Sequence, residues 1–276
     1  MELKKIVETF KNKDGVIYTS DRKILIGAPK NLKNCQILEG TEKIGRKAFM
    51  DCRSLKEVII PQTVKTICSD AFINCSSLYK VNIPQGITVL EKGLFFDCHS
   101  LSEIMIPDSV ENICSAAFFA CTSLRQIVIP ASVKNVQDNP FYRCHCNIDN
   151  RSDQYSVIDS ALYTKDMNKI IYCFSDEELF KVADGTKIIG DNCFCGCSNL
   201  HQLTVPESVE ELEMFALDEC PSLEWLIFLG KIRTAHLDGW FFDNDNLHQI
   251  IIPKGTMEHY QCVLNGDRDL LVEDNQ

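Results

Sequence analysis

The residues of this sequence with the greatest chemical potential are its 15 cysteines. Three of them form the C-x-C-x-C run Cys193, Cys195 and Cys197, and Cys144-His145-Cys146 is a second cluster. Thiolates bind zinc, but zinc sites usually contain cysteines at C-x₂₋₄-C spacing, which neither cluster has. We therefore expect no metal and no other cofactor, and a thiol-metal protein is the least favoured function considered.

Seven of the 15 cysteines belong to a series with an interval of 23 residues that is interrupted once. The regular series is Cys52, Cys75, Cys98, Cys121 and Cys144, followed later by Cys197 and Cys220. Free cysteine is among the most buried residue types, so we interpret the series as a column of small apolar side chains. The spacing of adjacent strands would allow disulfides. Parallel side chains do not point at one another, however, and we predict mostly free thiols.

The cysteines belong to a cassette of 23 residues that is clearest from Ile44 to Pro130. Phe, Leu and Pro recur in it at the same interval, as at Phe49, Leu55 and Pro61. A fixed period between 20 and 29 residues is typical of leucine-rich repeats. The cassette therefore predicts an α/β repeat fold, namely a leucine-rich-repeat solenoid of about eight turns with a parallel β-sheet on its concave face.

The positions within a cassette have distinct expected roles. In the stretch Leu78 to Ile83, alternation directs Val81 and Ile83 inward and the residues between them outward. Pro84 cannot donate to a ladder and is expected to end the strand. The Ala-Phe pair of each cassette is expected to begin a short helical turn on the opposite side, with each Phe stacked on the next.

A second internal similarity joins positions 145 residues apart. Gly15–Ala28 resembles Ser160–Phe174, and Tyr18 in the first stretch matches Tyr163 in the second. Each stretch is expected to be a hairpin that precedes repeats, and the first to cover the apolar end of the solenoid. The predicted division is 1–37 N-terminal cap with a β-hairpin, 38–148 leucine-rich repeats, 149–184 inserted β-hairpin, 185–253 leucine-rich repeats and 254–276 C-terminal cap.

The end of the chain departs from the cassette. The last turn is expected to contain Phe241 or Phe242. Thr256 is expected to cap a short helix that runs to Leu264 and stops at Asn265-Gly266. Asp269–Glu273 is expected to add a last strand.

Composition narrows the classes of function. The formal net charge is −11, and there is no run of Lys or Arg, so we expect no nucleic-acid partner. No apolar stretch is long enough to span a membrane, and no membrane insertion is expected. The N-terminus shows no signal peptide, so a cytoplasmic location is expected, with the cell surface or secretion as the alternative. No nucleophile–base constellation can be named, and we predict that the protein is not an enzyme.

The cassette I-x-I-P-x-x-V-x-x-I-G-x-x-A-F-x-x-C-x-x-L-x-x-I resembles the BspA-like, or Treponema pallidum-type, leucine-rich repeats over roughly residues 38–253. The resemblance implies a right-handed β-solenoid-like fold and a role in protein binding or adhesion. It implies no catalytic residues. Cys68 and Cys114 stand where this family usually has the Gly of Ile-Gly.

The outward positions of the predicted sheet give a candidate binding surface. The predicted partner-binding residues on the concave face are Ile59, Met105, Val128, Trp225, Ile227 and Ile251. Strand preference alone also places apolar residues at such positions, so two explanations stay open, strand preference and a strip that binds a partner. Trp225 is the expected anchor, because Trp is enriched in interface hot spots.

Two functions follow from these expectations. The first is a non-enzymatic protein-binding leucine-rich-repeat scaffold that acts through its concave sheet on a protein partner of unknown identity. The alternative is a cell-surface adhesion protein or antigen of the BspA-like type.

Overall fold

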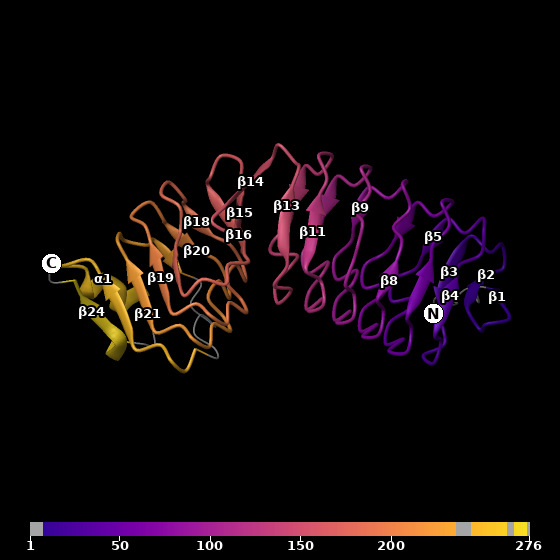
Figure 1. Ribbon diagram of the computed structural model, residues 1–276, viewed down its shortest axis with the longest axis horizontal. Coiled ribbons are helices and arrows are strands. Elements are labelled where there is room, and N and C mark those ends of the chain that lie inside the picture. The colour runs from indigo at the N-terminus through magenta and orange to yellow at the C-terminus, as the bar shows by residue number, and fades with distance from the viewer. Residues whose placement is uncertain (1–7, 236–243, 264–267, 275–276) are drawn as a thin grey trace, which may run out of the picture. The chain divides into compact units, whose positions relative to one another are not determined.

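The chain is built from two compact units, Met1–Ser152 and Asp153–Gln276. The computed structural model describes residues 8–235, 244–263 and 268–274. In Figure 1 the first unit runs from indigo to magenta and the second through orange to yellow. The turn expected at Phe241 or Phe242 and the helix stop at Asn265-Gly266 lie outside the described residues.

The first unit begins with an antiparallel hairpin that continues into the repeats. Three strands pair antiparallel, β3 then pairs in parallel with β5, and β5 pairs in parallel with β7. This sheet has the order β1-β2-β3-β5-β7. Its strands are β1 (Thr9–Lys11), β2 (Ile17–Thr19), β3 (Ile24–Gly27), β5 (Lys43–Ile44) and β7 (Thr66–Ile67).

The repeats of the first unit form three further parallel sheets. The same side of the unit that holds β5 and β7 carries β9 (Val89–Leu90), β10 (Asn112–Ile113) and β12 (Asn135–Val136). The strands before cassette prolines such as Pro61 and Pro130, together with the strands paired in register with them, form one sheet of three and one of two. These are β4 (Asn34–Gln36), β6 (Glu57–Ile59) and β8 (Lys80–Val81), and then β11 (Gln126–Ile129) and β13 (Asn147–Asn150).

The second unit repeats the same plan. Its first sheet starts with an antiparallel hairpin and has the order β14-β15-β16-β18-β20-β22. These strands are β14 (Tyr155–Ile158), β15 (Ala161–Thr164), β16 (Lys169–Cys173), β18 (Ile188–Ile189), β20 (Glu211–Leu212) and β22 (Thr234–Ala235). Its second sheet is parallel throughout: β17 (Leu179–Lys181), β19 (Gln202–Val205), β21 (Trp225–Phe228), β23 (Gln249–Ile252) and β24 (Leu271–Glu273).

The two hairpins are held by the same hydrogen bonds at positions 145 residues apart. The Tyr18 hydroxyl accepts a bond from the N–H of Leu38 at 3.4 Å, and the Tyr163 hydroxyl accepts one from Ala183 at 3.2 Å. In the first turn Asp21 accepts bonds from the Thr19 hydroxyl and the Lys23 N–H, which lower its pKa. Thr164, Asp166 and Asn168 repeat this arrangement. The internal similarity in the sequence is therefore a similarity of structure.

Stacked phenylalanines form the centre of the first unit. The rings of Phe49, Phe72 and Phe95 are fully buried, with centroids 5.0 and 5.4 Å apart and planes within about 11° of parallel. Phe118 and Phe141 continue the stack. The predicted stacking of one cassette Phe on the next is confirmed for this series. One stable register follows, because a shift by one residue would remove every ring from the stack.

The side opposite the sheet differs from the expected helical turn. Residues with positive φ recur there, such as Lys47 (59°) and Asp51 (58°), and such residues cannot continue a right-handed helix. The N–H of Phe49 donates to Ala71 of the next turn at 2.8 Å, and that of Asp51 donates to Ile73. Backbone donors here alternate between a carbonyl of the neighbouring turn and the carbonyl three residues back, as from Met50 to Lys47 at 3.0 Å, instead of the i−4 carbonyls that a helix needs. The solenoid is confirmed, but its helix content is small.

The solenoid has about ten turns, against the eight expected from the cassette. The sequence count missed strands whose turns lack the complete Leu-to-Pro signature. Examples are β4 and β13 in the first unit and β17 in the second. The predicted five-part division into caps and repeats stays a prediction.

The second unit ends in α1 (Met257–Val263), a 3-10 turn η1 (Arg268–Leu270) and β24. The expected last strand is present but shorter than Asp269–Glu273, since Asp269 and Leu270 belong to η1. Thr256 lies immediately before α1, at the expected N-cap position, and its hydroxyl donates to the carbonyl of Pro253. The carboxylate of Glu273 accepts from the N–H groups of Gly255, Thr256 and Met257 at 3.0 to 3.1 Å and so caps the helix from β24.

Candidate functional site

The cysteine column is built into the backbone of the stack. The thiol of Cys75 donates to the carbonyl oxygen of Phe49 at 3.1 Å, and Cys98 donates to Phe72 at 3.2 Å. The same bond, to the Phe 26 residues earlier, is made by Cys121, Cys144 and Cys220. Each thiol thus joins two consecutive turns, which is a structural role for the column.

Burial makes these thiols poor nucleophiles. It raises the pKa of Cys98, Cys144 and Cys193 well above 9.0, so the reactive thiolate is scarce. None of the 15 cysteines, all of which lie in the described part of the chain, forms a disulfide bond. Cys193, Cys195 and Cys197 of the C-x-C-x-C run are buried. Among the described residues, no group of three or more Cys, His, Asp or Glu side chains could hold a metal ion.

The second unit brings three of the six predicted binding residues together. Ile227 on β21 is paired in register with Ile251 on β23, and both are half-buried. Trp225, also on β21, is 37% exposed. The pairing continues from Ile251 to Val272 on β24, which is 39% exposed. An apolar column therefore crosses three strands on the outward face of the sheet.

The sequence analysis did not identify two outward residues of this surface. Val272 lies on a strand that follows no cassette, and Leu179 lies on β17, which has no cassette proline. Leu179 is 65% exposed and is paired with Gln202, the neighbour of Trp225 in the same column. Their alternation with buried Phe180 and Leu271 was the available signal, but strands of three residues give too short a pattern to read.

The first unit brings two of its three predicted residues to one cavity and leaves Ile59 apart from them. Ile59 on β6 is half exposed and lies beside Gln36. Asn82 of the next turn pairs with the backbone of Ile60, because its side-chain oxygen accepts from that N–H and its nitrogen donates to that carbonyl, both at 2.8 Å. The residue of the next turn that follows Ile59 in the outward column is therefore polar. Met105 and Val128 line one cavity of about 350 Å³, apart from Ile59.

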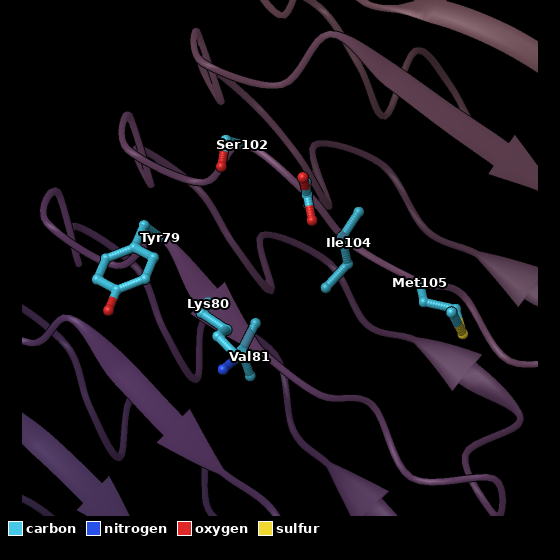
Figure 2. Close-up of a pocket in the computed structure, with 7 residues that line it drawn as sticks. Tyr79, Lys80, Val81, Ser102, Ile104 and Met105 are labelled. Atoms are coloured by element: carbon cyan, nitrogen blue, oxygen red, sulfur yellow. The ribbon is translucent and has the colours of Figure 1, made fainter.

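The segment that holds Met105 is not a strand. Residues 101–107 fit the cassette as well as their neighbours do, yet they pair with neither β8 nor β11. Met105 is 80% exposed, the highest value among the large apolar side chains described. A second cavity, of about 500 Å³, lies between this segment and β8. Figure 2 shows Lys80 and Val81 on the arrow of β8 and Ser102, Ile104 and Met105 on the neighbouring segment, which has no arrow.

Stacked parallel strands with a 23-residue period define a leucine-rich-repeat solenoid. The model of the BspA-type leucine-rich repeat region matches residues 28–147 and 168–266 in six copies, which is more than half of the sequence. The chain belongs to this family. Proteins of the family are typically non-enzymatic scaffolds. The comparison with curated proteins found no match.

Solved structures show the same fold. The chain is similar to a leucine-rich cell surface protein from Faecalibacterium prausnitzii, with 23% identity, a TM-score of 0.66, and 100% of this chain and 95% of that chain covered. It is also similar to a leucine-rich repeat protein from Bacteroides ovatus, with 22% identity, a TM-score of 0.58, and 99% and 75% of the two chains covered. In the part of the chain that the structure describes, no helix is long and apolar enough to cross a membrane.

Proposed function

We propose that the protein is a non-enzymatic protein-binding scaffold that acts through the outward face of its parallel sheets. The observation that carries the proposal is the apolar column of Ile227, Ile251 and Val272 in the second unit, with Trp225 beside it. Contiguous apolar surface of this kind marks interaction sites. Trp225 supplies the large, partly exposed side chain that anchors such contacts.

The six residues proposed to contact protein partners are Ile59, Met105, Val128, Trp225, Ile227 and Ile251. The group around Trp225 is the main surface, because its members adjoin one another. No catalytic role is assigned to any of the six, since their side chains are aliphatic, thioether or indole groups that neither accept nor supply protons in ordinary acid–base chemistry.

The test is a pull-down from a native lysate with wild type and the double variant Trp225→Ala, Ile227→Asp. Both positions face outward, so the variant should stay folded by circular dichroism and lose the captured proteins. A matched control changes the polar neighbours Gln202 and Gln249 to Ala, which should leave capture intact. A folded double variant that captures the same proteins at the same level would refute the proposed surface.

The second candidate function is a cell-surface adhesion protein or antigen. Membership of the BspA-type family supports it, and the F. prausnitzii protein of the same fold is described as a cell-surface protein. The location separates the two candidates. The test is to label source cells with antibodies against the purified chain. Staining of intact cells supports the cell-surface candidate, and staining only of broken cells supports a cytoplasmic scaffold.

A further inference from the structure

The parallel ladder of the first unit opens at one turn. The three-stranded sheet ends at β8 and the two-stranded sheet begins at β11, so two sheet edges face the segment 102–106 from either side. Among the described residues, no backbone partner is found for the N–H and C=O groups of Ser102 to Ile106. Backbone N–H and C=O groups are strong donors and acceptors, so these groups are available to the backbone of a partner.

The opening is local and does not break the stack. On another side of the same turn, β10 pairs in parallel with both β9 and β12. The N–H of Asp97 also donates to Phe119 of the following turn at 2.9 Å. The neighbouring turns are therefore held in place while the segment 102–106 stays free to pair.

Space and apolar surface accompany the free backbone groups. The cavities of about 500 Å³ and about 350 Å³ lie on the two sides of the segment. Ile104, whose equivalents Val58, Val81 and Ile127 are buried, is only half-buried. Met105 is 80% exposed between the two cavities.

The charges around the cavities favour a basic partner. Four charged residues line them, and both cations are already in ion pairs: Lys80 with Glu57 at 2.8 Å and Arg151 with Asp149 at 3.2 Å. The two carboxylates, Glu103 and Asp108, form no ion pair within the described part of the chain. The unneutralised charge at the opening is therefore negative.

We infer that the opening at residues 102–106 is a docking groove for an extended, basic peptide segment of a partner protein, which adds a strand to the interrupted ladder. Strand addition satisfies main-chain donors and acceptors, while pockets on either side select alternate side chains. Apolar side chains of the peptide occupy the cavities beside Ile104 and Met105, and its Lys or Arg side chains face Glu103 and Asp108. This inference rests on the protein-binding function proposed above, and its site belongs to the first unit, whereas Trp225 belongs to the second.

The test uses two libraries of acetylated, amidated six-residue peptides on beads. Both contain Val, Ile or Leu at alternate positions, and the other positions are Lys or Arg in one library and Asp or Glu in the other. The full-length protein should be retained by the basic library and not by the acidic one. Retention by neither library, or equal retention by both, would overturn the inference.

Backbone pairing is tested with the tightest peptide from the basic library. Binding should slow hydrogen exchange of the amides between Ser102 and Ile106, and N-methylation of the peptide amides should weaken binding by about tenfold or more. Equal binding by the N-methylated peptide would show that the backbone is not recognised.

A matched pair of variants separates the backbone donor from the side chain. Met105→Pro removes an N–H that has no partner in the described structure, whereas Met105→Ala keeps it. The Pro variant should lose the peptide and the Ala variant should bind it more tightly than the Pro variant does. If the Pro variant fails to fold, binding of the N-methylated peptide to the wild-type protein tests whether backbone pairing is required. The two proposals can fail separately. If no peptide binds but the Trp225 variant still loses its captured proteins, the groove is refuted and the proposed protein-binding function is not.

Discussion

The thiol of Cys98 donates a hydrogen bond to the carbonyl oxygen of Phe72 across 3.2 Å, from one turn to the preceding one. Both residues are fully buried. The same pair of residue types recurs along the stack, as in Cys75 with Phe49 and Cys220 with Phe194. Cysteine, which is a reactive residue in many other sites, acts here as a small buried hydrogen-bond donor.

Replacing Cys98 tests this role. Cys98→Ala should lower the free energy of unfolding by about 1–3 kcal/mol, because it removes the donor and leaves a small void. Cys98→Ser keeps a donor and should cost less. Urea denaturation followed by circular dichroism measures both. Cys262, which is exposed, provides the control: Cys262→Ala should leave stability unchanged. A Ser variant less stable than the Ala variant would show that packing, not the hydrogen bond, explains the cysteine.

Alkaline pH should destabilise the fold. Burial raises the pKa of the Cys98 and Cys220 thiols well above the ordinary 9.0. The folded thiols stay protonated while unfolded ones ionise, so stability that is complete below about pH 9 is lost as the pH rises, by up to ~1.4 kcal/mol per unit for each thiol. Urea midpoints at pH 8, 9 and 10 measure the loss. The Cys98→Ser variant should show a shallower decline, and an identical slope would contradict this cause.

The C-terminal helix should depend on Glu273. Its carboxylate accepts from three N–H groups at the start of α1, so Glu273→Ala should destabilise the second unit by about 1–2 kcal/mol. Glu273→Gln keeps an acceptor oxygen and should cost less. The readout is hydrogen exchange of the amides of Thr256 and Met257, which should speed up in the Ala variant. Unchanged exchange would mean that water replaces the carboxylate without cost.

The second unit should fold without the first. A fragment of residues 153–276 begins with the hairpin β14–β16, whose Tyr163 hydroxyl bonds to Ala183 just as Tyr18 bonds to Leu38. A matched fragment of residues 175–276 lacks the hairpin and exposes the apolar end of the stack. The longer fragment should melt cooperatively and the shorter one should not. Equal melting curves would show that the hairpin is not a cap.

The repeat and its inward face could be read from sequence because each cassette position has one environment. Phe72, Cys75 and Leu78 recur every 23 residues and are buried as expected. The opposite side was misjudged as a helical turn, since Ala-Phe is compatible with a helix and only the backbone shows the positive φ of residues such as Lys47. The pattern of side chains in the sequence does not indicate to which carbonyl a given backbone N–H group donates.

The candidate site was predictable only in part. Met105 and Trp225 are exposed, as alternation predicts. The opened ladder around Met105 could not be read, because Leu101, Ile106 and Pro107 match the cassette fully. Pairing between turns depends on the distance between their backbones. The sequence of one cassette does not determine that distance.

Each hairpin determines where the 23-residue series behind it starts. We expect a deletion in the first series to leave the register of the second unchanged, because the hairpin around Tyr163 precedes the second series and pairs with its first strand. Length changes of whole turns are thus confined to one unit at a time. The protein is therefore expected to tolerate gain or loss of 23 residues far better than gain or loss of one.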